Sequence, residues 1–382
     1  MHKKPLELYF HIPFCVKKCD YCDFLSAPAG EQDREAYMSA LIQETIQRAP
    51  EYQAYKVVSV FIGGGTPSVV EKEQIAGLLD QVHRLYDVSP DAEVTIEVNP
   101  GTVDLEKLTV YRQAGINRLS IGLQTANDAE LQAIGRIHTW QQFLDTYRAA
   151  AAAGFTNINV DLMSALPGQT LESYRSSVQK VLALRPAPTH ISAYSLILEE
   201  GTRLYEAVEK GSVVLPGEET DRLMYEETDR LLSEAGFVRY EISNYAKAGY
   251  ECRHNCGYWT RTEYAGFGIG AASLISNVRF SNAADIREYI AHPLCVRGEE
   301  ERLSREEQME EFMFLGLRLT KGIEVRNFEE LFGVALPEVY GEVIAKNLAD
   351  GLLCYTNDGK SLALTKKGLD LSNYVYAQFL IS

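Results

Sequence analysis

The sequence predicts an α/β fold, in which a partial barrel of six strand–helix units precedes a small, mostly helical C-terminal domain. Two observations predict the barrel. Short apolar segments alternate with amphipathic helical segments over the first half of the chain, as is typical of parallel strands joined by helices. Distinctive residues, among them a cysteine cluster and a glycine run, fall where these strands end, and this is the edge at which barrels collect functional groups.

The expected strands have the composition of strands that are covered on both faces. Residues 56–62, KVVSVFI, are almost continuously apolar, as expected for a parallel strand inside a sheet. The six expected strands are residues 7–12, 56–62, 93–98, 117–123, 157–162 and 189–196. The expected helices are residues 31–49, 71–86, 104–114, a helical stretch that ends near 153, and residues 171–184.

Beyond Gly201 the alternation of strands and helices stops. A helix is expected at residues 217–235 and a strand at 237–242, before the unusual segment CRHNCGYW at 252–259. Residues 299–311 then hold seven glutamates and two arginines, a composition typical of a linker or of the solvated start of a helix. The chain is therefore expected to divide into a barrel (1–200), a barrel extension (201–298) and a C-terminal domain (299–382).

The C-terminal domain resembles a winged helix. Ser304 and Glu307 form a capping-box pattern that opens a helical region, and Asn357-Asp358-Gly359 predicts a hairpin turn near the end. Winged helices often bind DNA. Residues 320–382 carry six Lys and Arg against eight Asp and Glu, so a structural lid or a surface for a protein partner is favoured.

The composition limits the classes of function. The 382 residues carry a net charge of −16, which argues against broad contact with nucleic acid or anionic lipid. No apolar run approaches the roughly 18–20 residues of a membrane span, and no apolar signal core follows Met1. Seven cysteines, an odd number, fit a reducing compartment, so a cytoplasmic location is expected. Cys295 and Cys354 are expected to be small buried residues.

Three cysteines follow the first expected strand with the spacing C-x3-C-x2-C, in the segment HIPFCVKKCDYCDF. Cysteine thiolates hold iron–sulfur clusters. A [4Fe–4S] cluster on Cys15, Cys19 and Cys22 would leave one iron without a protein ligand, and such an open position can bind a small molecule, as in catalytic metal sites. A disulfide, or a zinc site with His11 as the fourth ligand, is the alternative, although zinc sites commonly use two cysteine pairs.

Polar residues also mark the ends of the later strands. The turn Gly63-Gly64-Gly65-Thr66-Pro67 follows the second strand, and its backbone N–H groups could approach the polar end of a ligand closely. A tight turn that binds nothing is the alternative. Further along the chain, polar side chains that could bind a ligand occur at Glu97, Gln124, Arg136 and Asp161. Each could be an ordinary polar group, but together they favour a ligand site. Tyr9 and Tyr21 flank the cysteines and could pack on an aromatic ligand or shield a cluster.

The cysteine spacing and the GGGTP turn together resemble the radical S-adenosylmethionine (SAM) superfamily. The resemblance implies a partial (β/α)6 radical-SAM barrel, a [4Fe–4S] cluster on the three cysteines, and SAM bound to the open iron through its amino and carboxylate groups. In such proteins one electron cleaves the sulfonium into methionine and a 5′-deoxyadenosyl radical, so an electron-donor protein is a possible partner.

The resemblance narrows to the oxygen-independent coproporphyrinogen III oxidase family and covers nearly the whole chain. It rests on YFHIPFC at 9–15, GGGTP at 63–67, IEVNP at 96–100, SIGLQ at 120–124, GR at 135–136 and DLM at 161–163. The resemblance implies SAM contacts for Tyr9, Tyr21, Gly64, Gly65, Thr66, Glu97, Gln124, Arg136 and Asp161.

Two departures from the oxidases point to another branch of that family. The oxidases have a fourth cysteine two residues after the third, where this chain has Phe24, and they have a long N-terminal extension, whereas here the first cysteine is residue 15. The segment HNCGYW at 254–259 matches H-N-x-x-Y-W, a mark of the HemW branch, whose members are regarded as haem chaperones. The resemblance therefore favours haem delivery over the oxidative decarboxylation of coproporphyrinogen III, which is the alternative.

The HNCGYW segment has side chains that could serve haem. His254 could be an axial ligand of the iron, and Tyr258 and Trp259 could stack on the flat macrocycle. A well-packed aromatic turn with a hydrogen-bonded histidine is the alternative. The expected partners are haem, SAM, a haem-accepting protein and at most a transient contact with a membrane protein.

Overall fold

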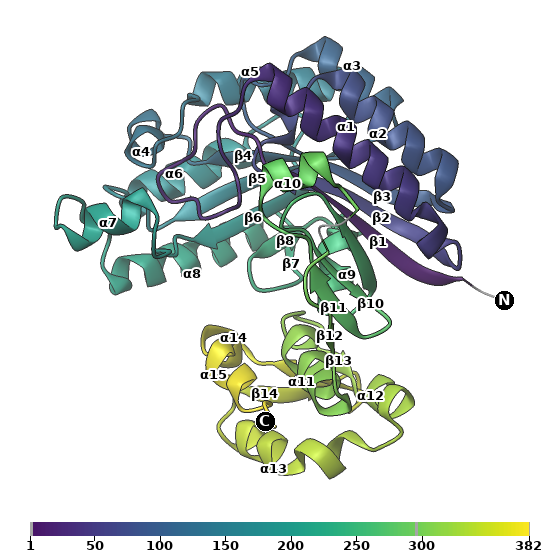
Figure 1. Ribbon diagram of the computed structural model, residues 1–382. Helices are drawn as coiled ribbons and strands as arrows, with labels where there is room; N and C mark the ends of the chain where they lie inside the picture. The colour runs from purple at the N-terminus through teal and green to yellow at the C-terminus, as the bar shows by residue number, and fades with distance from the viewer. Residues whose placement is uncertain (1–2, 295–296, 382) are drawn as a thin grey trace.

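In the computed structural model, which describes residues 3–294 and 297–381, one large sheet and one small sheet are formed. Twelve strands of this described part form the large sheet, in the order β12-β11-β10-β9-β1-β2-β3-β4-β5-β6-β8-β7. Figure 1 shows helices along the outer side of this sheet and the C-terminal domain as a separate lobe next to it.

Six neighbouring parallel strands form the wall of the barrel. They are β1 (Lys4–Ile12), β2 (Tyr55–Gly64), β3 (Val88–Val98), β4 (Arg118–Gln124), β5 (Asn157–Ser164) and β6 (His190–Ser195). The helices between them are α1 (Glu31–Arg48), α2 (Lys72–Leu85), α3 (Leu105–Gln113), α4 (Asp128–Ala133), α5 (Trp140–Ala152) and α6 (Leu171–Leu182). The predicted partial barrel of six strand–helix units is confirmed. Strand β3 starts earlier than predicted because Val88 pairs with Val57.

Strand β1 shows how the two faces of the sheet differ. Its side chains alternate between the faces, as in any strand. Those that point toward the helices, Leu6, Leu8 and Phe10, are fully buried in the main hydrophobic core. Those that point into the barrel are Glu7, Tyr9 and His11. The interior of the barrel is therefore polar and aromatic, and polar side chains reach it from the other strands as well.

The sheet continues beyond the six strands on both sides. On one side β9 (Glu263–Phe267) pairs with β1, followed by β10 (Ala272–Ile275), β11 (Val278–Ser281) and β12 (Glu301–Arg302). On the other side β8 (Asn244–Ala246) pairs with β6, followed by β7 (Val238–Arg239). In the described ranges β1 and β6 do not pair with each other, so the barrel stays open. The strand predicted at 237–242 contains only the two residues of β7.

The extension also contains four helices within the described residues. They are α7 (Arg203–Glu209), α8 (Glu218–Glu234), α9 (Arg253–Trp259) and α10 (Ile286–Ala291). Helix α8 confirms the prediction for residues 217–235. The HNCGYW segment, expected as an unusual segment or an aromatic turn, is the helix α9, which contacts β2 of the barrel and α11 of the C-terminal domain.

The C-terminal domain has a hydrophobic core of its own. Its elements are α11 (Arg305–Gly316), β13 (Ile323–Glu324), α12 (Val325–Phe332), α13 (Leu336–Ala349), β14 (Leu353–Thr356), β15 (Ser361–Leu364), α14 (Lys366–Asp370) and α15 (Ser372–Ala377). The capping box of Ser304 and Glu307 is present. Asn357 and Asp358 have positive φ in the turn between β14 and β15, as the predicted hairpin requires. The division into 1–200, 201–298 and 299–382 stays a prediction.

Among the described residues, no helix is both long enough and apolar enough to cross a membrane. Cys354 is half-buried on β14 rather than fully buried, and Cys295 lies outside the described residues.

Candidate functional site

A cavity lies at the carboxyl ends of strands β1 to β5. The predicted site residues that line it are Cys15, Cys19, Tyr21, Cys22, Gly64, Gly65, Thr66, Glu97, Gln124, Arg136 and Asp161. Of the residues predicted to contact SAM, Tyr9 alone is absent from this lining. Its hydroxyl is 3.0 Å from His11 Nδ1. The fold therefore brings together side chains that are far apart in the sequence.

The three cysteines lie on a loop that is held at several points by backbone hydrogen bonds. Cys15 N–H donates to the Ala27 carbonyl at 3.2 Å, and Asp20 N–H donates to the Ile134 carbonyl at 3.1 Å. The Thr66 hydroxyl donates to Cys15 Sγ at 3.5 Å. The loop is thus fixed to the glycine turn and to the end of α4 by contacts that the chain itself supplies.

Cys15, Cys19 and Cys22 line one shared cavity. Such a shared lining is compatible with a cubane, since each cysteine of a [4Fe–4S] cluster binds a different iron. In the part of the chain that the structure describes, no group of three or more His, Cys, Asp or Glu side chains is placed to hold a single metal ion. Phe24 lines the same cavity.

The glycine turn is packed directly against the strand and loop that carry the cysteines. Gly64 has a φ of 115°, and a Cβ there would lie 2.6 Å from the His11 ring. A Cβ on Gly65 would lie 2.7 Å from the Phe14 carbonyl oxygen. The Gly65 N–H donates to the Ile12 carbonyl at 2.8 Å, and the Gly64 N–H donates to Glu97 at 3.0 Å. The turn uses these two N–H groups to dock on its neighbours, and the approach of the turn to a ligand stays a prediction.

Two half-buried carboxyl groups, those of Glu97 and Asp161, face the cavity. Burial, and then the nearby charge of Asp161, raises the pKa of Glu97 to about 8. Burial likewise raises the pKa of Asp161, although Asn159 donates a hydrogen bond of 2.7 Å to it. A cationic ligand would stabilise both carboxylates in their charged form. The cavity is therefore suited to a positively charged group such as a sulfonium or an ammonium.

Arg136 brings a positive charge to the same cavity. Its guanidinium donates to Asn99 Oδ1 at 3.1 Å and to the Gly122 carbonyl at 2.9 Å. Its Nε is buried and has no hydrogen-bond partner among the described residues. The Arg136 side chain also interacts with Cys19, and an arginine at a cavity is suited to a carboxylate. Gln124, with a φ of 72°, ends β4 at a break in the register with β5.

Asn99 joins the two halves of this site, and the sequence predictions did not include it among the ligand-binding residues. Its Nδ2 donates to the Thr66 hydroxyl at 2.8 Å, and its Oδ1 accepts from Arg136. The sequence feature that could have indicated Asn99 was its place in IEVNP at the end of β3. Its position in the sequence did not reveal that it would bind both Thr66 and Arg136.

The comparisons with known proteins agree with this site. Residues 9–181 match the sequence model of the Radical SAM superfamily, and residues 303–371 match that of the HemN C-terminal domain. The chain is 39% identical over all of its length to the "Heme chaperone HemW" of Lactococcus lactis subsp. lactis (strain IL1403), of which it covers 99%.

The chain belongs to the HemW family. The HemW protein of Bacillus subtilis (strain 168) is also 39% identical, over 97% of this chain and 98% of that protein. The coproporphyrinogen III oxidase HemN of Escherichia coli, a radical SAM enzyme, has the same fold, with a TM-score of 0.85 at 24% identity over 99% of this chain and 91% of that one. The predicted family and fold are confirmed. Membership of the radical SAM superfamily supports a [4Fe–4S] cluster and SAM as the cofactors.

The HemW-type motif HNCGYW forms α9 at the other end of the barrel interior. His254 is 1% exposed, and both of its ring nitrogens have partners. Nδ1 is 2.8 Å from the Ser59 hydroxyl and Nε2 is 2.9 Å from the Tyr258 hydroxyl. Burial, and then the charge of Arg118, lowers the pKa of His254 to about 3, so the ring is neutral. Coordination of haem iron by His254 stays a prediction, and it would require one of these hydrogen bonds to break.

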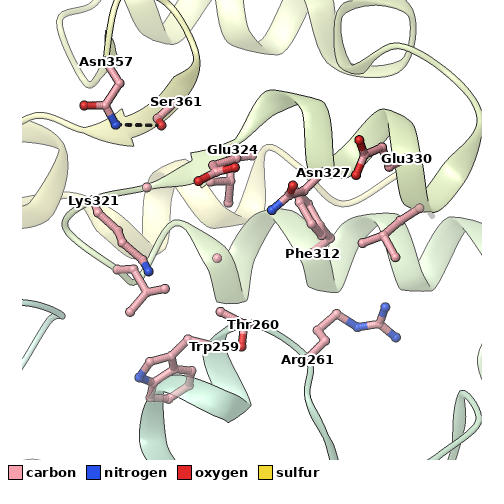
Figure 2. A pocket seen from close by; sticks show the side chains of 15 residues that line it. Trp259, Thr260, Arg261, Phe312, Lys321, Glu324, Asn327, Glu330, Asn357 and Ser361 are labelled. Carbon is pink, nitrogen blue, oxygen red and sulfur yellow. Dashed lines mark hydrogen bonds between the residues drawn. The ribbon is translucent and has the colours of Figure 1, made fainter. Parts of the chain in front are cut away.

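The last residue of the motif has different surroundings. Trp259 lines a groove of about 420 Å³ between α9 and the C-terminal domain. The Arg318 guanidinium lies 4.2 Å from the centre of its ring. Figure 2 shows Trp259, Thr260 and Arg261 on one side of this groove, with Lys321 reaching toward Trp259 from the C-terminal domain.

Proposed function

We propose that the chain is a haem chaperone that binds haem and delivers it to an acceptor protein, and that it carries a [4Fe–4S] cluster with SAM at its open iron. The observation that carries the proposal is the full-length similarity to proteins named "Heme chaperone HemW". The cavity residues described above support the cofactor part. We place the protein in the cytoplasm as part of the same proposal.

The cofactor residues have separate roles in this proposal. Cys15, Cys19 and Cys22 would hold the cluster, and Glu97 and Asp161 would face the positive part of SAM. The cavity residues Gly64, Gly65, Thr66, Gln124 and Arg136, together with Tyr21 and Tyr9, would orient SAM and exclude water. The cluster and SAM together supply an electron-driven cleavage of the sulfonium when an electron donor is available.

Haem would bind in the groove of Figure 2. Trp259 offers an aromatic face and Phe312 an apolar one, while Lys321 offers a positive charge for a propionate. The volume of about 420 Å³ lies within the range of about 300–1,000 Å³ of small-molecule pockets. Tyr258 and His254 belong to the same helix, but the His254 ring is turned toward Ser59 of the barrel and the Tyr258 hydroxyl toward His254. The groove also borders the C-terminal domain, which is the surface proposed for the acceptor protein.

The experiment is a haem titration followed by transfer. The chain is purified without oxygen, its cluster is reconstituted, and haem is added while the Soret spectrum is recorded. The haem-loaded chain is then mixed with a haem-free b-type haem protein. We expect saturable binding and transfer that is faster than transfer from free haem. A chain that binds no haem, or that transfers it no faster than free haem does, would overturn the proposal.

Trp259→Ala and Lys321→Ala test the groove. Both variants should weaken haem binding, because each removes a side chain that contacts the proposed ligand. His254→Ala in the same titration tests the axial role: an unchanged spectrum and affinity would remove His254 from the haem site.

The oxidase alternative is tested on the same preparation. The chain is incubated without oxygen with a reductant, SAM and coproporphyrinogen III. Phe24 in place of the fourth cysteine of the oxidases leads us to expect no protoporphyrinogen. Formation of protoporphyrinogen with release of CO2 would overturn the view that the chain acts only as a chaperone.

A further inference from the structure

A continuous series of side-chain contacts runs through the barrel from α9 to the cysteine loop. The rings of His254 and Phe61 stack with their centres 5.1 Å apart, and Phe61 stacks on Tyr9 at 6.3 Å. The Tyr9 hydroxyl is 3.0 Å from His11 Nδ1, and His11 Nε2 is 2.8 Å from the Leu25 carbonyl oxygen. We call His254, Phe61, Tyr9 and His11 the interior column.

The His11 end of the interior column contacts both the cysteine loop and the glycine turn. Leu25 follows the third cysteine of the loop, so the hydrogen bond from His11 fixes the loop where it leaves the cluster. The His11 ring also lies against the glycine turn, so close that a Cβ on Gly64 would be 2.6 Å from it. A movement of Tyr9 or His11 would therefore displace the cysteine loop and the glycine turn together.

The His254 end of the interior column is held by hydrogen bonds from several elements. The two ring nitrogens of His254 are bound by Ser59 and Tyr258, as described above. The carboxylate of Glu93 on β3 accepts from the backbone N–H groups of Arg253 and His254 at 3.1 and 3.2 Å. The start of α9 is thereby fixed to the barrel wall, and the orientation of the His254 ring is fixed with it.

A glycine brings α9 close to the barrel. A Cβ on Gly257 would lie 2.1 Å from a carboxyl oxygen of Glu7 on β1. Any larger residue would push the helix away from β1 and withdraw the His254 ring from Phe61. The HNCGYW segment thus has the residue types that a helix needs in order to pack at this distance against the interior of the barrel.

We propose that His254 is a positioning residue for the cluster loop and the SAM site, and that it acts through Phe61 and Tyr9. Its ring packs against Phe61. This contact would hold Phe61, Tyr9 and His11 in one arrangement. The inference rests on the SAM site of the proposed function and is independent of haem binding. In this proposal the histidine of HNCGYW lies at one end of the barrel interior and supports the cysteine loop at the other end.

The test compares three variants of the full chain with reconstituted cluster. His254→Ala removes the ring, His254→Phe restores a ring that can stack on Phe61, and Leu79→Ala removes a buried side chain of α2 outside the interior column. SAM is titrated, and the electron paramagnetic resonance spectrum of the reduced cluster is recorded with and without it. We expect His254→Ala to raise the Kd of SAM roughly tenfold, as supporting residues behind metal ligands typically do, and to alter the spectral response to SAM.

His254→Phe should restore the Kd of SAM to within about threefold, since stacking is retained, and Leu79→Ala should leave the Kd and the spectrum unchanged. A His254→Ala variant with the parent's SAM affinity and spectrum would overturn the proposal. An equal effect in Leu79→Ala would also overturn it, because general destabilisation would then explain the loss.

If His254→Ala does not fold, Phe61→Leu gives the same comparison without disturbing a hydrogen bond. A Phe61→Leu variant that binds SAM with the parent's affinity would also overturn the proposal. Failure of the haem titration in the parent chain would overturn the proposed function and leave these SAM measurements unaffected, so the two outcomes are distinguishable.

Discussion

Both ends of the barrel interior are rich in polar residues, but the two ends are organised differently. At the carboxyl ends of the strands, Glu97, Asp161 and Arg136 face a cavity, and the Arg136 Nε has no partner among the described residues. At the opposite end α9 covers the interior, and the ring nitrogens of His254 are used by Ser59 and Tyr258, although one buried carboxylate oxygen of Glu7 also has no partner among the described residues. Polar composition alone therefore does not distinguish a ligand site from a packed support. At the carboxyl ends of the strands, side chains of both charge signs line one cavity together with the three cysteines, whereas the polar side chain of α9 that enters the interior is held by its neighbours.

The largest expected difference between the two ends is in cluster content, when one cysteine at each end is replaced by serine. Cys19→Ser should lose the reconstituted cluster, because a hydroxyl is a poor substitute for a thiolate ligand of iron. Cys252→Ser should retain it, since Cys252 is fully buried at the start of α9, where its thiol donates to Glu93 at 3.5 Å. Iron and sulfide per chain and the visible absorption spectrum are the measurements. A complete cluster in Cys19→Ser, or its loss in Cys252→Ser, would contradict the assignment.

Two glycines with positive φ give the next comparison. Gly64→Ala should lower the free energy of unfolding by about 3–5 kcal/mol, since it combines backbone strain with a clash against His11. Gly333 ends α12 with a φ of 63° and has no atom within 4 Å of an added Cβ. Gly333→Ala should therefore cost only the strain, about 1–2 kcal/mol. Urea unfolding measures both, and SAM titration should detect a loss only in Gly64→Ala. Equal losses of stability would show that the clash with His11 is relieved.

The half-buried carboxyl of Glu97 predicts a pH dependence of stability. Its pKa is raised from 4.5 to about 8 in the folded chain, first by burial and then by the charge of Asp161. Between these values the folded chain keeps a proton that the unfolded chain releases. Stability from this group is therefore complete below about pH 4.5 and is lost as the pH rises toward 8.

Glu97→Gln removes this titration. The difference in unfolding free energy between pH 5 and pH 8 should be smaller in the variant than in the parent by roughly 1–3 kcal/mol. Urea unfolding of the cluster-free chain at the two pH values is the measurement. An identical pH dependence in both chains would mean that Glu97 is ionised throughout, and that the cavity already stabilises its charge without a ligand.

The fold and the cofactor cavity could be predicted from local patterns. Apolar runs such as residues 56–62 mark strands that are buried on both faces, and residues at the ends of parallel strands necessarily meet at one edge of the sheet. The convergence of Cys15, Gly64, Glu97 and Asp161 follows from these two facts.

The structure of α9 could not be predicted in this way. Its position depends on Ser59, Glu93 and Glu7, which lie far away in the sequence, and its glycine is explained only by the approach of Gly257 to Glu7. Local sequence offered aromatic side chains and a histidine, which suit haem or a packed turn equally well. The hydrogen-bond partners of the Gly64 and Gly65 N–H groups could not be predicted for the same reason, because Ile12 and Glu97 come from other strands.

The smallest effects, and the most direct comparison of the two ends, concern one buried hydroxyl at each. The Thr66 hydroxyl accepts from Asn99 at 2.8 Å and donates to Cys15 at 3.5 Å. The Ser59 hydroxyl lies 3.1 Å from Glu7 and 2.8 Å from His254. Thr66→Val and Ser59→Ala should each lower the free energy of unfolding by about 1 kcal/mol.

Their effects on the cofactors should differ. Thr66→Val removes a hydrogen bond to a cluster ligand and should shift the reduction potential of the cluster, because such bonds help to set it. Ser59→Ala leaves the stacking of His254 on Phe61 in place, so the potential and the SAM affinity should stay at the parent's values. A shift in Ser59→Ala as large as that in Thr66→Val would mean that the hydrogen bonds of His254, rather than its ring, support the cysteine loop.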